Sequence, residues 1–244
     1  MTLLSVVRDV CAAVGVTLPQ SVFSNITGNR TMQEMLSTAN EMAQRIAYDQ
    51  REWVALRATA GATGDGIKDA FAMPANYKRL LVTSNVWRSG NPSQPMRFIS
   101  DHDEWVQRRM SNAVTSPGEW ILSNSSLGLS MYIHPILAVG ETTSFFYLDK
   151  NCVKLASGGY GDVFMADLDE FRLDERLLKL AMIYQWKAQK GSSYAEDMST
   201  FGDALTVAMG HDAPAPILID RKPISAHTKL VAQSHTIYVP GMVP

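Results

Sequence analysis

LDERLLKLAMIYQWKAQKGSSYAEDMSTFGDALTVAM, residues 173–209, is the stretch that decides the fold. It predicts two helices joined at Gly191. In the first, apolar side chains recur at helical spacing behind Asp174 and Glu175, whose negative charges favour a helix N-terminus. Gly191 can adopt the left-handed conformation that ends a helix. The pattern therefore predicts a core helix that buries one broad face.

The second helix of this stretch is predicted to start directly after the glycine. Ser193 and Glu196 have the spacing of a capping box, in which each side chain binds a free backbone N–H of the first turn. Aromatic and aliphatic residues follow at helical spacing as far as Gly210. Two helices with so short a link must fold back or bend sharply, so they need a third element to cover their apolar faces.

The N-terminal part of the chain supplies two further predicted helices. One covers residues 3–14 and ends at Gly15; the other begins with a second capping-box spacing, Thr31 and Glu34, and continues to about residue 52. Packed on the helices of 173–210, the pair in residues 1–52 would complete a four-helix bundle whose halves lie at opposite ends of the sequence.

The period of the sequence changes between these two helix pairs. Short alternating segments predict strands at residues 120–122, 129–133 and 142–148, with a short helix at 101–110. The alternating run around Leu80 to Val86 predicts a hairpin or an irregular strand pair. We therefore expect a mainly α protein: a four-helix bundle from N- and C-terminal helix pairs, with a small antiparallel β region inserted at residues 53–172 and an extended C-terminal arm at 211–244.

The expected arm combines prolines with apolar residues and shows little helical periodicity. Disordered tails are usually poorer in Ile, Val and Leu, so this composition favours a segment that packs on a surface outside its own fold. The alternative is a peripheral strand on the chain's own domain. The candidate contact residues of the arm are Ile217, Leu218, Ile219, Ile224, Leu230, Val231, Ile237, Tyr238 and Val239.

Composition bounds the function classes. The formal net charge is −2, the pI is about 6.2 and 46% of residues are hydrophobic, which argues against a protein whose main role is to neutralise phosphates. Cys11 and Cys152 are far apart and are expected to be buried and reduced. Arg8 and Asp9 interrupt the apolar N-terminus, and no apolar run approaches the length of a membrane span. We expect a soluble protein folded in the cytoplasm, with no membrane partner.

No sequence motif for catalysis, metal binding or cofactor binding stands out. The five histidines are scattered, neither cysteine has a CxxC partner, and the glycine cluster at 158–161 lacks the Lys and Ser or Thr of a phosphate loop. We therefore expect no cofactor and no metal. The carboxylates of Asp162, Asp167, Asp169 and Glu170 could form an acid–base pair, or they could be a solvated, dipole-stabilising helix start.

Several phrases of the chain resemble the head-to-tail adaptor proteins of short-tailed bacteriophages. The resemblance covers roughly residues 1–210, and its motifs are packing and turn phrases. They are the segment from Trp53 to Leu56 before a glycine loop, AMPANYKRL at 72–80, Trp87, FFYLDKN at 145–151, LLKLAMIYQWKAQKG at 177–191 and YAED at 194–197.

This resemblance implies a structural virion protein rather than an enzyme. Such adaptors form a ring, commonly of twelve subunits, beneath the portal in the neck of the virion. The ring continues the channel for double-stranded DNA and provides the attachment surface for the tail tube or nozzle. The resemblance assigns the apolar residues of the arm to contact with the portal protein or a neighbouring subunit.

Three basic residues are candidates to line such a channel: Arg88, Arg108 and Arg109. The alternative for them is ordinary solvated surface. Two other functions stay open. A tail nozzle or tail-fibre attachment protein would use the same fold with different partners, and a hydrolytic enzyme would need convergent acid–base or metal-binding residues.

Overall fold

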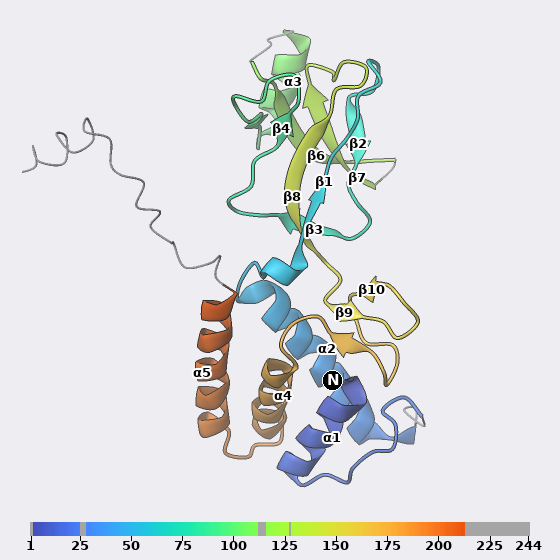
Figure 1. Cartoon of the computed structure of the whole chain (residues 1–244), viewed down its shortest axis with the longest axis vertical. Helices are drawn as coiled ribbons and strands as arrows, with labels where there is room; N and C mark the ends of the chain where they lie inside the picture. Colours follow the sequence, from blue (N-terminus) through green and yellow to red (C-terminus); the bar gives the residue numbers. More distant parts are fainter. Residues whose placement is uncertain (1, 25–27, 112–115, 127, 213–244) are drawn as a thin grey trace, which may run out of the picture.

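The computed structural model describes residues 2–24, 28–111, 116–126 and 128–212. The molecule is elongated and consists of two lobes stacked end to end (Figure 1). A helical lobe contains both ends of the described chain, and a β lobe is built from its middle. None of the described helices combines the length and the apolar character needed to cross a bilayer.

The helical lobe is organised around α4, as the deciding stretch predicts. It contains α1 (Leu3–Val14), α2 (Arg30–Gln44), α4 (Glu175–Gln189) and α5 (Ala195–His211), and α4 contacts each of the other three. A short π-helical segment, Arg45–Asp49, extends α2 towards the β lobe. The largest fully buried side chains of this lobe include Leu3, Met35, Met42, Ile46 and Leu177.

Two of the three glycines expected to end helices do so, whereas Gly210 lies inside α5, which continues to His211. Gly15 after α1 and Gly191 after α4 both have a positive φ, of 74° and 70°. At the start of α4, the side chain of Asp174 accepts a hydrogen bond from the backbone N–H of Arg176 (2.8 Å). These local signals hold because each depends only on neighbouring backbone.

Both predicted capping boxes are wrong. Helix α5 begins after Tyr194, with no side-chain bond at its cap. Helix α2 begins after Asn29, whose side chain accepts from the backbone N–H of Met32 (3.2 Å). The Glu34 carboxylate instead forms ion pairs with Arg30 and with Lys190 at the end of α4. The carboxylate that a capping box would use to bind a backbone N–H is therefore engaged elsewhere.

Two sheets form the β lobe. The first has the order β1-β8-β3, with β4 also paired to β8, and the second has the order β2-β7-β6-β5. All pairs are antiparallel except β5 with β6. The strands are β1 (Arg57–Ala60), β2 (Ala70–Ala72), β3 (Tyr77–Leu80), β4 (Trp87–Arg88), β5 (Arg97–Phe98), β6 (Glu119–Ser125), β7 (Gly128–His134) and β8 (Thr143–Asp149), with α3 (His102–Met110) covering one end.

A third sheet belongs to the helical lobe, and the sequence analysis missed it. It has the order β10-β9-β11, formed by β10 (Tyr160–Gly161), β9 (Val153–Lys154) and β11 (Glu170–Phe171). Val153 and Phe171 are buried in the same core as the helices. Thr2, directly before α1, forms an antiparallel bridge with Glu170. These strands have two residues each, too short to show an alternating pattern.

The prediction of a mainly α four-helix bundle is wrong, because the described fold is mixed α/β with three sheets. The four long helices do pack together, but part of their core is closed by β9 and β11. Strand β8 joins the two lobes: Phe145 and Tyr147 lie in the core of the β lobe, while Leu148 lies in the core of the helical lobe. The strands are therefore part of both cores.

The guanidinium of Arg172 ties together the two chain segments that cross between the lobes. It donates to the carbonyl of Ala55 on the ascending segment (2.7 Å). On the descending segment it donates to the carboxylate of Asp149 (2.9 Å) and to the carbonyl of Asn151 (2.6 Å). The ring of Tyr160 lies 4.3 Å from its central carbon. The Arg172–Asp149 pair is largely buried, so this contact is shielded from water.

We predict that Arg172→Lys loosens this junction. An ammonium keeps the charge but cannot reach both segments with a rigid fork of donors. Amide hydrogen exchange at residues 150–153 should accelerate by an amount equal to about 1–3 kcal/mol of lost local stability. Arg176→Lys on the exposed face of α4 is the matched control. Equal exchange in the two variants would contradict the role of Arg172.

Candidate interaction surfaces

The predicted arm contacts lie outside the described residues. This applies to all nine: Ile217, Leu218, Ile219, Ile224, Leu230, Val231, Ile237, Tyr238 and Val239. What the structure does show is the point from which this segment leaves the folded body.

That point, the arm root, is held at the junction between the lobes. The carboxylate of Asp212, directly after α5, pairs with the guanidinium of Arg51 (3.2 Å). It also accepts from the backbone N–H of Val54 (3.1 Å), and Arg51 donates to the carbonyl of Met209. Arg51 and Asp212 are mostly buried, so the chain is fixed up to its last described residue.

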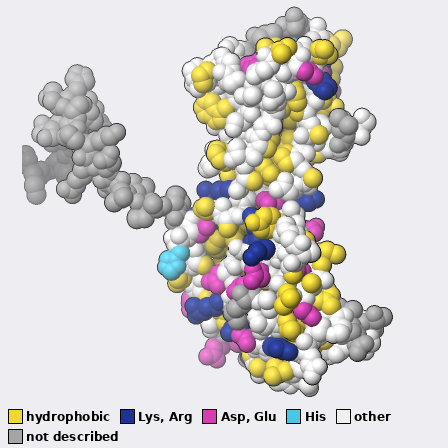
Figure 2. All heavy atoms as spheres, turned by 45° about the vertical axis from the view of Figure 1, so that its right-hand side comes forward, with side chains coloured by type: hydrophobic (Ala, Val, Ile, Leu, Met, Phe, Trp, Pro, Cys, Tyr) yellow, Lys and Arg dark blue, Asp and Glu magenta, His cyan; other side chains and the backbone are white. Residues whose placement is uncertain are grey.

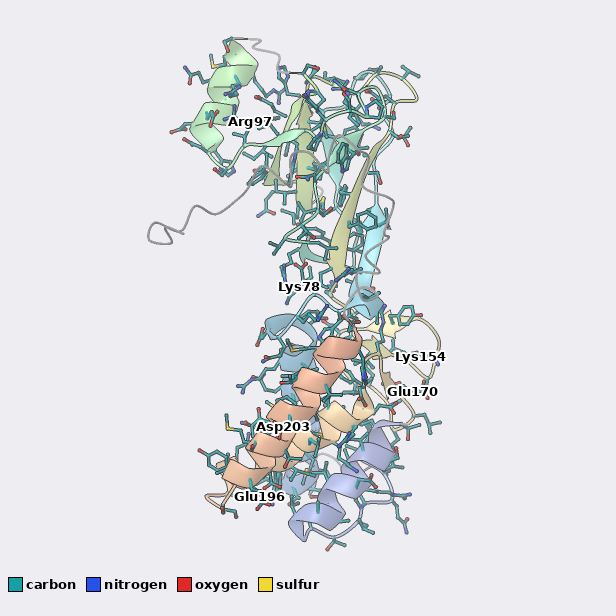
Figure 3. All side chains as sticks on the ribbon, turned by 60° about the vertical axis from the view of Figure 1, so that its left-hand side comes forward. Lys78, Arg97, Lys154, Glu170, Glu196 and Asp203 are labelled. Atoms are coloured by element: carbon teal, nitrogen blue, oxygen red, sulfur yellow. The ribbon has the colours of Figure 1, made fainter. Side chains whose placement is uncertain are left out.

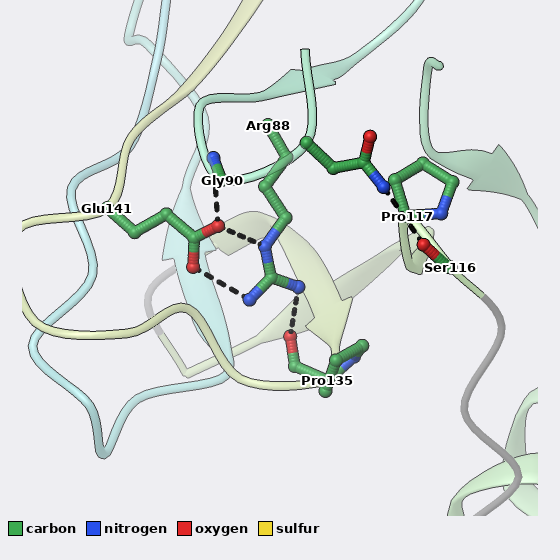
Figure 4. A pocket seen from close by; sticks show the side chains of 7 residues that line it. Arg88, Gly90, Ser116, Pro117, Pro135 and Glu141 are labelled. Carbon is green, nitrogen blue, oxygen red and sulfur yellow. Dashed lines mark hydrogen bonds and ion pairs between the residues drawn. The ribbon is translucent and has the colours of Figure 1, made fainter. Parts of the chain in front are cut away.

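The three predicted channel-facing arginines all form ion pairs within the chain. Arg88 is the most enclosed: its Nε and one terminal nitrogen bind the two carboxylate oxygens of Glu141 (2.5 and 2.7 Å), as Figure 4 shows. It also donates to the carbonyls of Pro135 (3.0 Å) and Ile136 (3.2 Å). The hydrogen bonds from Arg88 hold the pKa of the Glu141 carboxyl below its usual value. This guanidinium closes a loop of the β lobe.

Arg108 and Arg109 lie on α3 at the far end of the β lobe. Arg108 donates to the buried carboxylate of Glu119 (2.6 Å) and to Glu104 (2.9 Å). Arg109 pairs with Asp69 (2.7 Å) and is 43% exposed. Each charge is therefore balanced by a carboxylate.

The carboxylates considered for acid–base chemistry are mainly occupied by backbone or side-chain donors. Asp169 is 1% exposed and accepts from the N–H groups of Ala156, Met165 and Ala166 (2.6–2.8 Å). Such bonds shape a loop. The Asp167 carboxylate accepts hydrogen bonds from the backbone N–H of Val22 (2.7 Å) and from the hydroxyl of Ser21. The Glu170 carboxylate forms an ion pair with the Lys154 ammonium (3.0 Å); both residues are labelled in Figure 3.

Cys11 and Cys152 are both free and buried, as predicted. Burial raises the pKa of each thiol, which disfavours the reactive thiolate. Among the described residues, no group of three or more His, Cys, Asp or Glu side chains is placed to hold a metal ion.

A polar hollow, the waist depression, lies beside the arm root. It encloses about 360 Å³ and is lined by the 48–52 segment, Arg57, Arg79, Val82 and Thr83. Arg51, which holds Asp212, forms part of its wall. The Glu52 carboxylate pairs with Arg79 and accepts from the N–H of Val82 (3.0 Å).

An apolar groove continues from the waist depression onto the β lobe, because Val82 lines both hollows. It encloses about 390 Å³ between the 80–86 segment and strands β5 and β6. Val86, Met96 and Trp120 are buried members of the β-lobe core that line its floor. The rim carries Val82, 83% exposed, and Phe98, 51% exposed, with the Phe98 ring 4.6 Å from that of Trp120.

Charges are distributed unevenly over the molecule. Figure 2 shows hydrophobic side chains gathered over the visible face of the β lobe, while charged side chains concentrate at the waist and on the helical lobe. On α5, the exposed carboxylates of Glu196 and Asp203 have no ion-pair partner within the described ranges (Figure 3). At the waist, the exposed Lys78 ammonium lies 4.8 Å from the Tyr48 ring centre.

Sequence reasoning missed the groove. Its lining comes from the segments around residues 80–86, 96–98 and 120–122, which only the sheet topology brings together. The one sequence signal is the alternating run from Leu80 to Val86, which predicts a hairpin or an irregular strand pair. In the structure β3 ends at Leu80, and Val82 faces solvent.

Comparison with known proteins adds no family assignment: neither a protein-family model nor a curated protein matches the chain.

We predict that Glu141→Gln destabilises the β lobe by about 2–3 kcal/mol at pH 7, because the enclosed Arg88 loses its counter-charge. The native pKa of Glu141 lies below that of the unfolded chain, about 4.3. The stabilisation is therefore fully present above that pH and lost as pH falls through the native pKa. Denaturant unfolding of both proteins should show their difference shrinking below about pH 4. Glu170→Gln, in an exposed pair, is the control; a pH-independent difference would contradict the assignment.

We also predict that Asp212→Ala frees the end of α5. The variant removes the partner of Arg51 and the acceptor of the Val54 N–H, at a cost of about 1–3 kcal/mol. Hydrogen exchange in the last turn of α5 should speed up accordingly. Asp203→Ala, on the exposed face of the same helix, should leave that exchange unchanged. Protection that survives Asp212→Ala would show that the arm root is held by other contacts.

Proposed function

We propose that the chain is a head-to-tail adaptor of a short-tailed bacteriophage, a structural subunit of a ring beneath the portal. In this role it continues the DNA channel and provides the attachment surface for the tail tube or nozzle. The ring has twelve copies of the chain and sits in the neck of the virion. The proposal starts from the phrases at 72–80, 145–151 and 177–191 that resemble such adaptors.

The observation that carries the proposal is the division of the molecule into two end-to-end lobes with separate cores (Figure 1). A neck subunit has to present one end to the portal side and the other to the tail side. The hydrogen bonds of Arg172 to Asp149 and Ala55 connect the two chain segments that cross between the lobes. A body of this kind holds the partner bound at one end at a fixed position relative to the partner bound at the other end.

The surface charges support contacts with other protein chains. The β lobe has a charge-poor, apolar face, whereas α5 carries the exposed carboxylates of Glu196 and Asp203, which form no ion pair with the residues that the structure describes. Neighbours in a ring meet through two different surfaces, so a subunit with unlike faces suits this symmetry. Channel-facing positions for Arg108 and Arg109 belong to the same proposal, whereas the Arg88 side chain is only 11% exposed and closes a loop of the β lobe. Their charges are balanced within the chain, which suits DNA that must slide without tight phosphate binding.

The arm is proposed to provide the contact with the portal or the adjacent subunit. Because Asp212 is fixed at the junction between the lobes, the segment beyond it leaves the body from a defined position. A truncation should therefore end after Asp212, which keeps the Arg51 ion pair and the last turn of α5.

Native mass spectrometry tests the proposal. The full chain is measured alone and after mixing with the portal protein of the same phage. We expect a 26.9 kDa monomer alone and a ring of subunits on the portal. The chain truncated after Asp212 should stay monomeric and fail to join the portal. Unchanged assembly of the truncated chain would overturn the role of the arm, and a full chain that ignores the portal would overturn the proposed function.

A further inference from the structure

We infer that, in the free chain, the apolar groove of the β lobe is the docking site for the chain's own segment 213–244, with Ile217, Leu218 and Ile219 as its first anchors. The occupant is thus part of the same polypeptide. The inference concerns the chain before any assembly and does not rest on the proposed function.

Shared residues connect the arm root with the groove. Asp212 is paired with Arg51, and Arg51 lines the waist depression. Val82 lines both the waist depression and the groove. A chain leaving Asp212 therefore starts beside the waist depression, which shares Val82 with the groove.

The order of residues in the segment matches this route. Residues 213–216 read APAP, and their prolines cannot continue the hydrogen-bond ladder of α5. An extended stretch of these four residues spans at most about 14 Å. The next three residues are the apolar Ile217, Leu218 and Ile219, followed by Asp220 and Arg221. Charged and polar residues make up most of the depression's lining, and apolar residues make up most of the groove's lining. A short spacer followed by an apolar triplet matches these residue types in the same order.

The groove combines exposed apolar side chains with a polar group that has no acceptor among the described residues, which are the features of a surface that another segment covers. Val82 and Phe98 expose large apolar surfaces on its rim, and Trp120 on its floor has a buried indole N–H with no acceptor in the described part of the chain. The N–H of Met96 bonds to the carbonyl of Val86 (2.9 Å), which fixes the groove walls. Burying an Ile or Leu side chain in such a groove removes its apolar surface from water, which favours docking.

Tethering favours occupation of the groove by the chain's own segment over occupation by the same segment of another copy. A short flexible link gives an effective concentration in the millimolar range, well above that of a free protein in dilute solution. A weak apolar contact is therefore made within the chain first. Any partner that binds the arm must first displace it from the groove. Docking therefore slows binding of the arm to other surfaces in the free chain.

Photo-cross-linking of the full chain tests the inference. The photoreactive residue p-benzoylphenylalanine replaces Phe98 on the groove rim. In a second protein it replaces Phe146, which is also 51% exposed but does not line the groove. The proteins are irradiated at low concentration as a mixture of ¹⁵N-labelled and unlabelled copies, and cross-linked peptides are identified by mass spectrometry.

We expect the Phe98 probe to cross-link to residues 213–244 of the same copy, with a yield at least about tenfold above that of the Phe146 probe. Cross-links between labelled and unlabelled copies would overturn the assignment to the same chain. Equal yields from both probes would overturn the groove as the docking site.

Hydrogen exchange in the otherwise unmodified chain gives a second readout. Leu218→Asp should accelerate exchange at residues 82–86 by roughly tenfold, because a charged side chain is costly in an apolar groove. His235→Asp is the control, since it adds the same charge outside the anchor triplet. Unchanged exchange in Leu218→Asp would contradict docking of that triplet.

Discussion

The two-lobed shape depends on how Arg172 binds both chain segments that cross between the lobes. Its guanidinium reaches Ala55, Asp149 and Asn151, and the ring of Tyr160 covers it. A largely buried charge is stable only when its donors are used, so this residue can adopt few arrangements. The neighbouring residues Tyr147 and Leu148 of β8 are buried in the core of the β lobe and in the core of the helical lobe, respectively. The junction is therefore packed against both cores.

Several charged groups that look functional in the sequence are used to build the body. Arg88 closes a loop through Glu141, Asp169 gathers three backbone N–H groups, and Glu34 joins α2 to α4. The exposed chemistry of the described surface is then mainly apolar, on the β lobe, and acidic, on α5. Such surfaces favour contacts between protein chains, which is why the proposals concern assembly and the position of the arm.

Local signals predicted the individual elements well. Gly15 and Gly191 end helices where expected, Asp174 caps α4, and the strands predicted near 120–122, 129–133 and 142–148 correspond to β6, β7 and β8. Errors arose where a group had two possible partners. Glu34 could cap α2 or pair with Lys190, and the sequence does not show the distance to α4. The two-residue strands of the third sheet have no periodicity from which they could be predicted.

The sequence by itself determined the four long helices, the strands β6 to β8, and that the two cysteines are buried thiols, because these depend on side-chain periodicity, backbone conformation and composition. Only the tertiary structure decided that the strands belong to both cores, that the three candidate arginines are paired, and that an apolar groove forms on the β lobe beside the waist depression. These features join residues far apart in the chain, such as Arg51 with Asp212 and Met96 with Trp120. Pairing at such separations depends on packing geometry, which no local pattern encodes.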